Sequence, residues 1–149
     1  MENIMIGFAN VFQLSNLLVC IGGLFIGVLF GALPGFSATM AVAIFVPFTY
    51  VMEPGAALLL LSALYCGGVF GGSIPAVLVG IPGTPASAPT ALEGKALVRK
   101  GEAGRALNLV TLASCFGGFV SSVALLVCAP LLAKIAKMVG QPEQMFVAI

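Results

Sequence analysis

Hydroxyl residues stand beside glycine and proline at three places in the sequence, a pairing suited to binding chemistry. The segments are Pro34-Gly35-Phe36-Ser37-Ala38-Thr39, Gly71-Gly72-Ser73 and Pro82-Gly83-Thr84. Proline and glycine break helices, and a helix that begins after a break presents free backbone N–H groups and the positive end of its dipole. Such helix ends bind anions, while unwound carbonyl groups hold cations. The hypothesis assigns anion binding to Pro34, Gly35, Ser37, Thr39, Gly71, Gly72, Ser73, Pro82, Gly83 and Thr84.

The alternative interpretation is that these breaks are only kinks and surface turns. The repetition of Leu33-Pro34-Gly35 as Ile81-Pro82-Gly83 favours a binding role. A catalytic role for Ser73 is disfavoured, because the chain has no His and the surrounding apolar sequence has no Lys or carboxylate to activate a hydroxyl. We therefore expect no enzyme. Four cysteines are scattered without a CxxC pair, so neither a metal site nor a disulfide is expected: Cys20, Cys66, Cys115 and Cys128.

The elements that position these residues must lie in a membrane. Of the 149 residues, 60% are hydrophobic and only 7% are charged, whereas soluble domains carry about 25% charged residues. Residues 3–52, 54–92 and 106–133 contain no charge at all. A net charge of +1 without a basic run gives no reason to expect nucleic-acid binding.

Because a helix needs about 20 apolar residues to cross a bilayer, the sequence predicts an all-α integral membrane protein. We expect a polytopic helical bundle with broken or re-entrant helices at the Pro-Gly motifs, forming a single membrane unit over residues 1–149. The predicted spans are residues 14–33, 37–52, 56–81 and 106–133.

Glycines shape two of these predicted spans. In the first, Gly23, Gly27 and Gly31 recur at every fourth position and predict a face that a neighbouring helix can approach closely. In the third, four glycines and a proline within residues 67–75 predict a helix that is broken or unwound inside the membrane.

Residues 93–105 hold six of the eleven charged residues, four of them basic. Basic residues concentrate on the cytoplasmic side of membrane proteins. The sequence therefore predicts a cytoplasmic loop over these residues.

The segments GALPGFSATMAVAIFVPFTY and YCGGVFGGSIPAVLVGIPGTPASAPTALEGKALVRKGEAGRAL resemble the large permease subunit of tripartite tricarboxylate transporters, the TctA family. The resemblance covers about Asn16 to Phe146, with several glycines and prolines in the same order and spacing. Members of that family are much longer. The chain therefore resembles the N-terminal portion of such a permease, and a new apolar stretch begins near its end.

The resemblance implies a multi-pass protein of the bacterial inner membrane that takes up small di- or tricarboxylates by secondary active transport. It also implies a small membrane subunit, a periplasmic solute-binding protein and the remaining C-terminal part of the permease as partners. No cofactor is expected beyond a coupling ion, Na⁺ or H⁺. The alternative is a truncated or accessory membrane protein without transport activity of its own.

Overall fold

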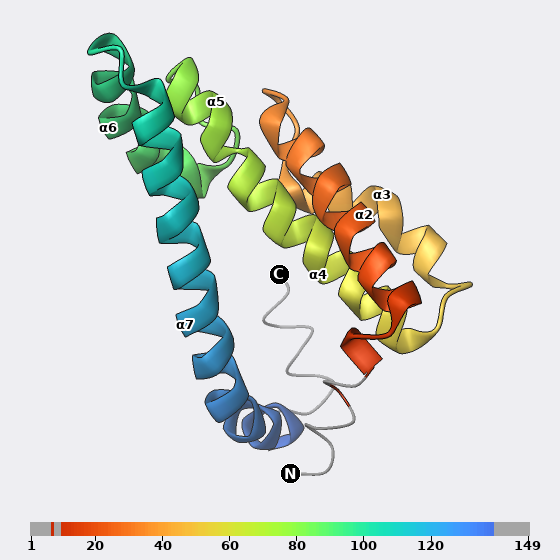
Figure 1. Cartoon of the computed structure of the whole chain (residues 1–149). Coiled ribbons are helices and arrows are strands. Elements are labelled where there is room, and N and C mark those ends of the chain that lie inside the picture. The colour runs from red at the N-terminus through yellow and green to blue at the C-terminus, as the bar shows by residue number, and fades with distance from the viewer. Residues whose placement is uncertain (1–6, 8–9, 139–149) are drawn as a thin grey trace. The chain divides into compact units, whose positions relative to one another are not determined.

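The computed structural model describes residue 7 and residues 10–138, with side chains up to residue 129. The chain forms two compact units, Met1–Thr111 and Leu112–Ile149. In the described residues every regular element is a helix (Figure 1), which confirms the predicted all-α class. In chain order the elements are α2 (Leu14–Ala32), α3 (Ala38–Thr49), α4 (Pro54–Gly71), α5 (Ser73–Leu78), the 3₁₀ helix η1 (Pro85–Ser87), α6 (Ala88–Arg99) and α7 (Ala103–Met138).

Among the described residues, three helical stretches are long and apolar enough to cross a membrane: Leu14–Ala32, Pro54–Leu78 and Ala103–Ala129. Helix α3 is also apolar but has only 12 residues, which gives about 18 Å of helix. It is therefore too short to cross the ~30 Å hydrocarbon layer by itself.

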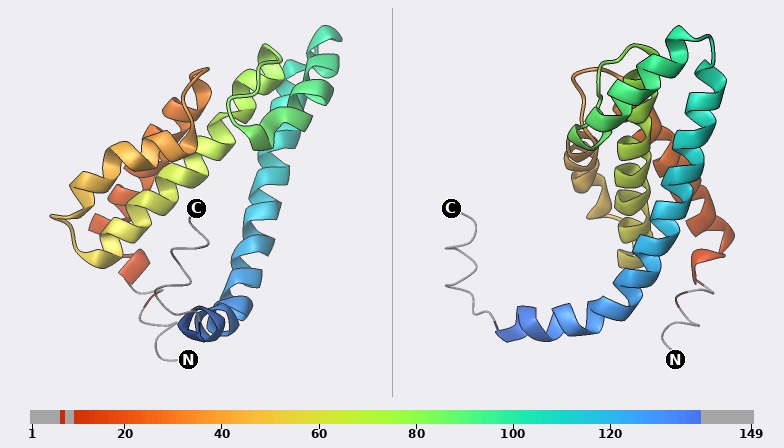
Figure 2. Two further views of the ribbon diagram at one scale, coloured as in Figure 1. Left: turned by 180° about the vertical axis from the view of Figure 1, so that it is seen from behind. Right: turned by 90° about the vertical axis from the view of Figure 1, so that its left-hand side faces the viewer.

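The core of the first unit is the contact between α2 and α4, which lie side by side in Figures 1 and 2. The three buried residues of α2 are Gly23, Gly27 and Gly31. A side-chain carbon added to Gly27 would overlap the carbonyl oxygen of Leu64, and one added to Gly31 would overlap that of Gly68. The predicted glycine face of the first span is thus confirmed as a surface of backbone contact.

Helix α4 contributes glycines to the same interface. A side-chain carbon on Gly67 would lie 2.5 Å from the carbonyl oxygen of Leu24, and one on Gly71 would overlap that of Val28. Because glycines face backbone from both sides, the two helix axes approach more closely than larger side chains would permit.

This packing corrects one prediction, the broken or unwound helix over residues 67–75. Helix α4 continues to Gly71 and α5 begins at Ser73, so only Gly72 interrupts the helix. The backbone of Gly72 keeps a helical conformation, with φ −63° and ψ −18°, and its N–H donates to the Gly68 carbonyl oxygen over 3.1 Å. The glycines remain helical because the neighbouring helices α2 and α3 fill the space beside them.

The segment expected to be a loop, residues 93–105, is helical instead. Helix α6 runs to Arg99, a turn follows with Gly101 at φ +81°, and α7 begins at Ala103. Helix α6 packs on α5, and a side-chain carbon on Gly94 would lie 2.9 Å from the Cα atom of Val77. The charges did not prevent helix formation, because apolar contact with α5 stabilises one face while the charged residues lie on others.

Helix α7 continues from the first unit into the second. Its 36 residues correspond to about 54 Å of helix. Ala106, in the first unit, is buried, whereas every residue from 111 to 129 is exposed. The described part of the second unit is therefore a helix whose apolar surface suits contact with lipid or other helices.

We expect Gly27→Leu to destabilise the first unit by about 1–3 kcal/mol or more, because the new side chain would occupy the position of α4 backbone. The matched control is Gly22→Leu on the same helix, where an added side-chain carbon meets nothing within 4 Å. Thermal unfolding of the two variants in detergent micelles checks the difference. Equal midpoints for both variants would contradict the close contact of α2 with α4.

Candidate functional site

The first predicted break follows α2. The helix ends at Ala32, Leu33 is extended, and Gly35 has φ +95°, a left-handed conformation that favours glycine. Ser37 caps α3, because its hydroxyl accepts from the N–H of Met40 over 3.2 Å. The hydroxyls of Ser37 and Thr39 lie 2.8 Å apart. The break is therefore a turn that ends in a hydroxyl-capped helix N-terminus.

The second break follows α5 and has its own capping hydroxyls. The chain turns at Gly80, with φ +78°, and returns toward the end of α4. The hydroxyls of Thr84 and Ser87 form a reciprocal capping box at η1. The Ser87 hydroxyl donates to the Thr84 carbonyl over 2.8 Å, and both side chains are buried. Gly83 itself does not have a positive φ.

The two breaks meet on one face of α4. A side-chain carbon on Gly68 would lie 2.7 Å from the Cβ atom of Ala38, and one on Gly72 would lie 2.8 Å from the Cγ2 atom of Thr84. Gly68 and Gly72 are four residues apart and share a helix face. The starts of α3 and η1 therefore lie about one helical pitch, ~5.4 Å, apart along α4.

Gly83 joins the second break to both long helices. Its N–H donates to the Gly72 carbonyl over 3.1 Å. A side-chain carbon on Gly83 would lie 2.5 Å from the Gly31 carbonyl oxygen and 2.8 Å from the Cα atom of Gly72. Gly83 is needed here for close approach of backbone, not for a positive φ.

Two helix N-termini thus lie near one turn of α4 and point in opposite directions. Helix α3 runs back along α4 to the turn that precedes Pro54, whereas α6 runs forward along α5, where Gly94 contacts Val77. Both positive dipole ends lie where the surrounding sequence carries no charged residue. The arrangement can stabilise a small anion at the ends of α3 and η1–α6.

The structure brings together only some of the predicted site residues. Gly72, Gly83 and Thr84 are in direct contact, and Ala38, which lies beside Gly68 of α4, stands between Ser37 and Thr39 in the sequence. Gly71 instead faces α2, Ser73 is buried at the start of α5, and Pro34, Gly35 and Pro82 are exposed in the turns.

Three residues of this region were not predicted: Gly31, Gly68 and Ser87. Gly31 was assigned only to helix packing, yet its carbonyl oxygen also contacts Gly83. Gly68 and Gly72 are four residues apart, a spacing that places two glycines on one helix face and indicates that other segments can pack there. Ser87 follows Thr84 by three residues, which is the spacing of a capping box.

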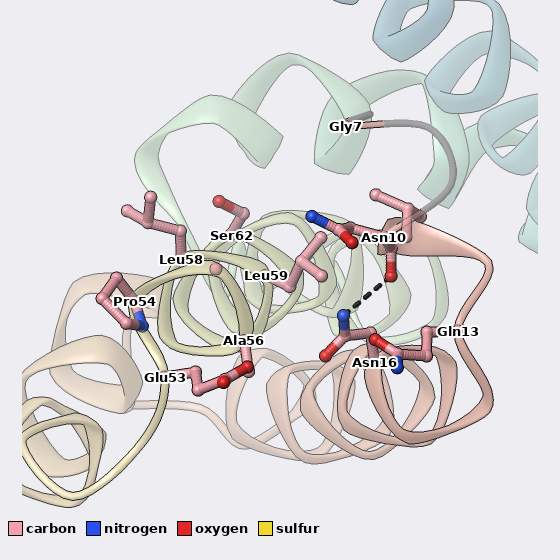
Figure 3. A pocket seen from close by; sticks show the side chains of 12 residues that line it. Gly7, Asn10, Gln13, Asn16, Glu53, Pro54, Ala56, Leu58, Leu59 and Ser62 are labelled. Atoms are coloured by element: carbon pink, nitrogen blue, oxygen red, sulfur yellow. Dashed lines mark hydrogen bonds between the residues drawn. The ribbon is translucent and has the colours of Figure 1, made fainter. Parts of the chain in front are cut away.

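A cavity of about 480 Å³ lies elsewhere in the first unit, beside the N-terminal ends of α2 and α4 (Figure 3). None of the predicted site residues lines it. In the part of the chain that the structure describes, no three His, Cys, Asp or Glu residues gather in a way that could hold a metal ion.

Apolar helices of membrane-spanning length, with two proline–glycine breaks docked on one of them, define an all-helical integral membrane protein. Comparison with known families makes the assignment more specific. The model of the tripartite tricarboxylate transporter TctA family matches residues 17–149, and the chain belongs to this family.

One relative is an uncharacterized 52.8 kDa protein in the TAR-I ttuC' 3' region of Agrobacterium vitis. The two sequences are 39% identical over 142 residues, which cover 95% of this chain and 28% of the relative. The chain thus spans little more than a quarter of that protein's length. No solved structure matches the chain significantly.

Ser87→Ala should destabilise the first unit by about 1–3 kcal/mol, because it removes a buried hydroxyl that donates to the Thr84 carbonyl and leaves buried polar groups without this partner. Ser122→Ala is the control: its hydroxyl also bonds a carbonyl, that of Gly118, but at an exposed site of α7. We expect a change within about 0.5 kcal/mol there. Denaturant unfolding in micelles measures both, and a smaller loss for Ser87→Ala than for Ser122→Ala would contradict the role of the buried cap.

Proposed function

We propose that this chain forms part of the permease of a tripartite transporter and that it takes part in the secondary active uptake of small di- or tricarboxylates. Family membership supports a role in a tripartite tricarboxylate transporter. The observation that carries the proposal is the meeting of the two broken segments at Gly68 of α4 and at Gly72, the residue that follows α4.

In this proposal, a carboxylate group of the substrate binds at the N-terminal ends of α3 and η1–α6. Backbone N–H groups and the hydroxyls of Ser37 and Thr39 supply donors, and the two helix dipoles supply partial positive charge. Hydrogen bonds between Thr84 and Ser87 stabilise the conformation of the second break. The glycines let the backbone of the second break pack closely against Gly31 and Gly72, which holds the two helix ends near each other.

The proposed partners are a periplasmic solute-binding protein that delivers the carboxylate, a small membrane subunit and the part of the permease beyond this chain. The proposed location is the bacterial inner membrane, with α6 and the start of α7 on the cytoplasmic side. The basic residues Lys95, Arg99, Lys100 and Arg105 support this orientation. The coupling ion is Na⁺ or H⁺.

The orientation is tested by single cysteines at opposite ends of the first unit. Leu92 on α6 is 78% exposed, and Val51 between α3 and α4 is 90% exposed. We expect a membrane-impermeant thiol reagent to label Val51→Cys in spheroplasts and Leu92→Cys only in inverted vesicles. Labelling is quantified by mass spectrometry of the peptides, since native cysteines are also present. Labelling of Leu92→Cys from outside intact spheroplasts would refute the orientation.

The binding site is tested by Gly83→Ala in a full-length permease that carries this segment, reconstituted with its partners. The added carbon would lie 2.5 Å from the Gly31 carbonyl oxygen and displace the second break from α4. We expect radiolabelled carboxylate uptake in proteoliposomes, normalised to inserted protein, to fall at least tenfold, which corresponds to about 1.4 kcal/mol.

The matched control for this experiment is Gly104→Ala at the start of α7, where an added carbon meets nothing within 4 Å. It should retain the uptake of the unchanged permease. Thr84→Ala should have a milder effect than Gly83→Ala, because one neutral hydrogen bond contributes about 1 kcal/mol. Normal uptake by Gly83→Ala would mean that the breaks are structural turns and that the substrate binds elsewhere.

A further inference from the structure

Ser73 begins α5 and carries a buried hydroxyl group, since only 9% of the residue is exposed. Among the residues that the structure describes, this hydroxyl has no hydrogen-bond partner. Other helical hydroxyls of the chain behave differently, because those of Thr111 and Ser122 each donate to the carbonyl oxygen one turn earlier, over 2.8 Å. The Ser73 hydroxyl is therefore free to bond a group that is not part of the fold.

The Ser73 oxygen is also within reach of a ligand. In the described part of the chain, every side-chain nitrogen or oxygen that is fully enclosed has a hydrogen-bond partner. Because the Ser73 oxygen has none, it is not fully enclosed and retains some accessible surface. Burial of a hydroxyl without a partner costs free energy, and a ligand group that accepts from this hydroxyl would offset that cost.

The contacts between α5 and the segment that follows it fix where Ser73 lies. At the start of α5, a side-chain carbon on Gly72 would lie 2.8 Å from the Cγ2 atom of Thr84. Further along, one on Gly94 would lie 3.0 Å from the Cγ2 atom of Val77. The two contacts occur in the same order along both segments, so α5 and α6 run in the same direction.

The side chain of Ser73 projects toward α6. Ser73 precedes Val77 by four residues, so the two side chains share a face of α5. Because Val77 contacts Gly94, Ser73 lies one turn before the level of Gly94, beside the first turn of α6. Helices α5 and α6 lie side by side in Figures 1 and 2. The unused hydroxyl is thus directed at the η1–α6 end of the proposed carboxylate site.

The surroundings of Ser73 favour an anion. The first turn of α6 carries the positive end of the helix dipole. Lys95 of α6 reaches the far end of α5, where its Nζ atom would lie 3.2 Å from a side-chain carbon on Gly80. Glu93 of α6 is exposed, and residues 54–92 contain no charged residue. The helix dipole and the ammonium group both stabilise negative charge at this interface.

We propose that the Ser73 hydroxyl donates a hydrogen bond to a carboxylate group of the substrate, between α5 and the first turn of α6. The inference deepens the proposed function and rests on it, because it adds a side chain that binds the substrate at the η1–α6 end. Hydrogen bonds to charged groups are stronger than those between neutral groups. An anion therefore gains more from Ser73 than a neutral ligand of the same shape.

The test measures the binding of radiolabelled succinate and citrate to a full-length permease that carries this segment, in nanodiscs, by a scintillation proximity assay. We expect Ser73→Ala to raise the dissociation constant about tenfold or more, the effect of losing one hydrogen bond to a charged group. The neutral analogue succinamide should not displace the label. Ser62→Ala, at an exposed position of α4, is the matched control and should bind like the unchanged permease.

A second measurement separates ligand binding from a structural role. Because the Ser73 hydroxyl has no partner within the described residues, Ser73→Ala should leave the thermal unfolding midpoint without ligand unchanged. Ser87→Ala removes a bonded hydroxyl of the same region and should lower that midpoint. A hydroxyl that only stabilised the fold would give Ser73→Ala the same behaviour as Ser87→Ala.

Three results would overturn the inference: equal dissociation constants for Ser73→Ala and the unchanged permease, no saturable binding of either carboxylate, or displacement by succinamide. A lowered midpoint of Ser73→Ala without ligand would also overturn it. Carboxylate uptake in proteoliposomes is measured separately. Binding that depends on Ser73 without any uptake would support the inference and contradict the proposed function, whereas uptake with the same half-saturating concentration in Ser73→Ala would do the reverse.

Discussion

Backbone-to-backbone contact between α2 and α4 is the constraint on which the first unit depends. Inside a bilayer, burial of apolar side chains gives little net attraction between helices, because lipid tails are equally apolar. Helices associate instead by close packing, and glycine permits the closest approach. Gly27 of α2 faces the backbone of α4, while Gly67 and Gly71 of α4 face that of α2. This reciprocal contact fixes the register of the two helices, and the register in turn sets which residues meet at each end.

Glycines also form the surface at the C-terminal end of α4, where the candidate site lies. Gly68 and Gly72 face Ala38 and Thr84, so the two breaks dock on backbone and not on bulky side chains. The carbonyl oxygen of Gly31 takes part in both the helix contact and the approach of Gly83. The contact between α2 and α4 therefore also positions the proposed binding site, and a change that separates the two helices should displace the second break.

The first unit has a different polarity at each end of the α2–α4 pair. One end gathers hydroxyls and two helix N-termini, an arrangement that favours an anion. At the other end, the cavity is lined by the amides of Asn10, Gln13 and Asn16 and by the exposed carboxylate of Glu53.

The sequence by itself determined the class of the protein and much of its local structure. Its apolar stretches imply membrane helices, Pro34 and Gly35 end α2 as expected, and the glycine–proline motifs identify the family. It could not determine whether a run of glycines breaks a helix or lets a neighbouring helix pack closely against it. Glycine permits both, and the contacts with the neighbouring element decide between them. Only the tertiary structure showed that residues 67–72 stay helical against α2 and α3. It also showed that the charged segment forms the end of α6, which packs on α5, and that Gly83 lies against Gly31. Asn16 and Glu53 likewise lie far apart in the sequence, and only the packing of α2 against α4 brings both into the lining of one cavity.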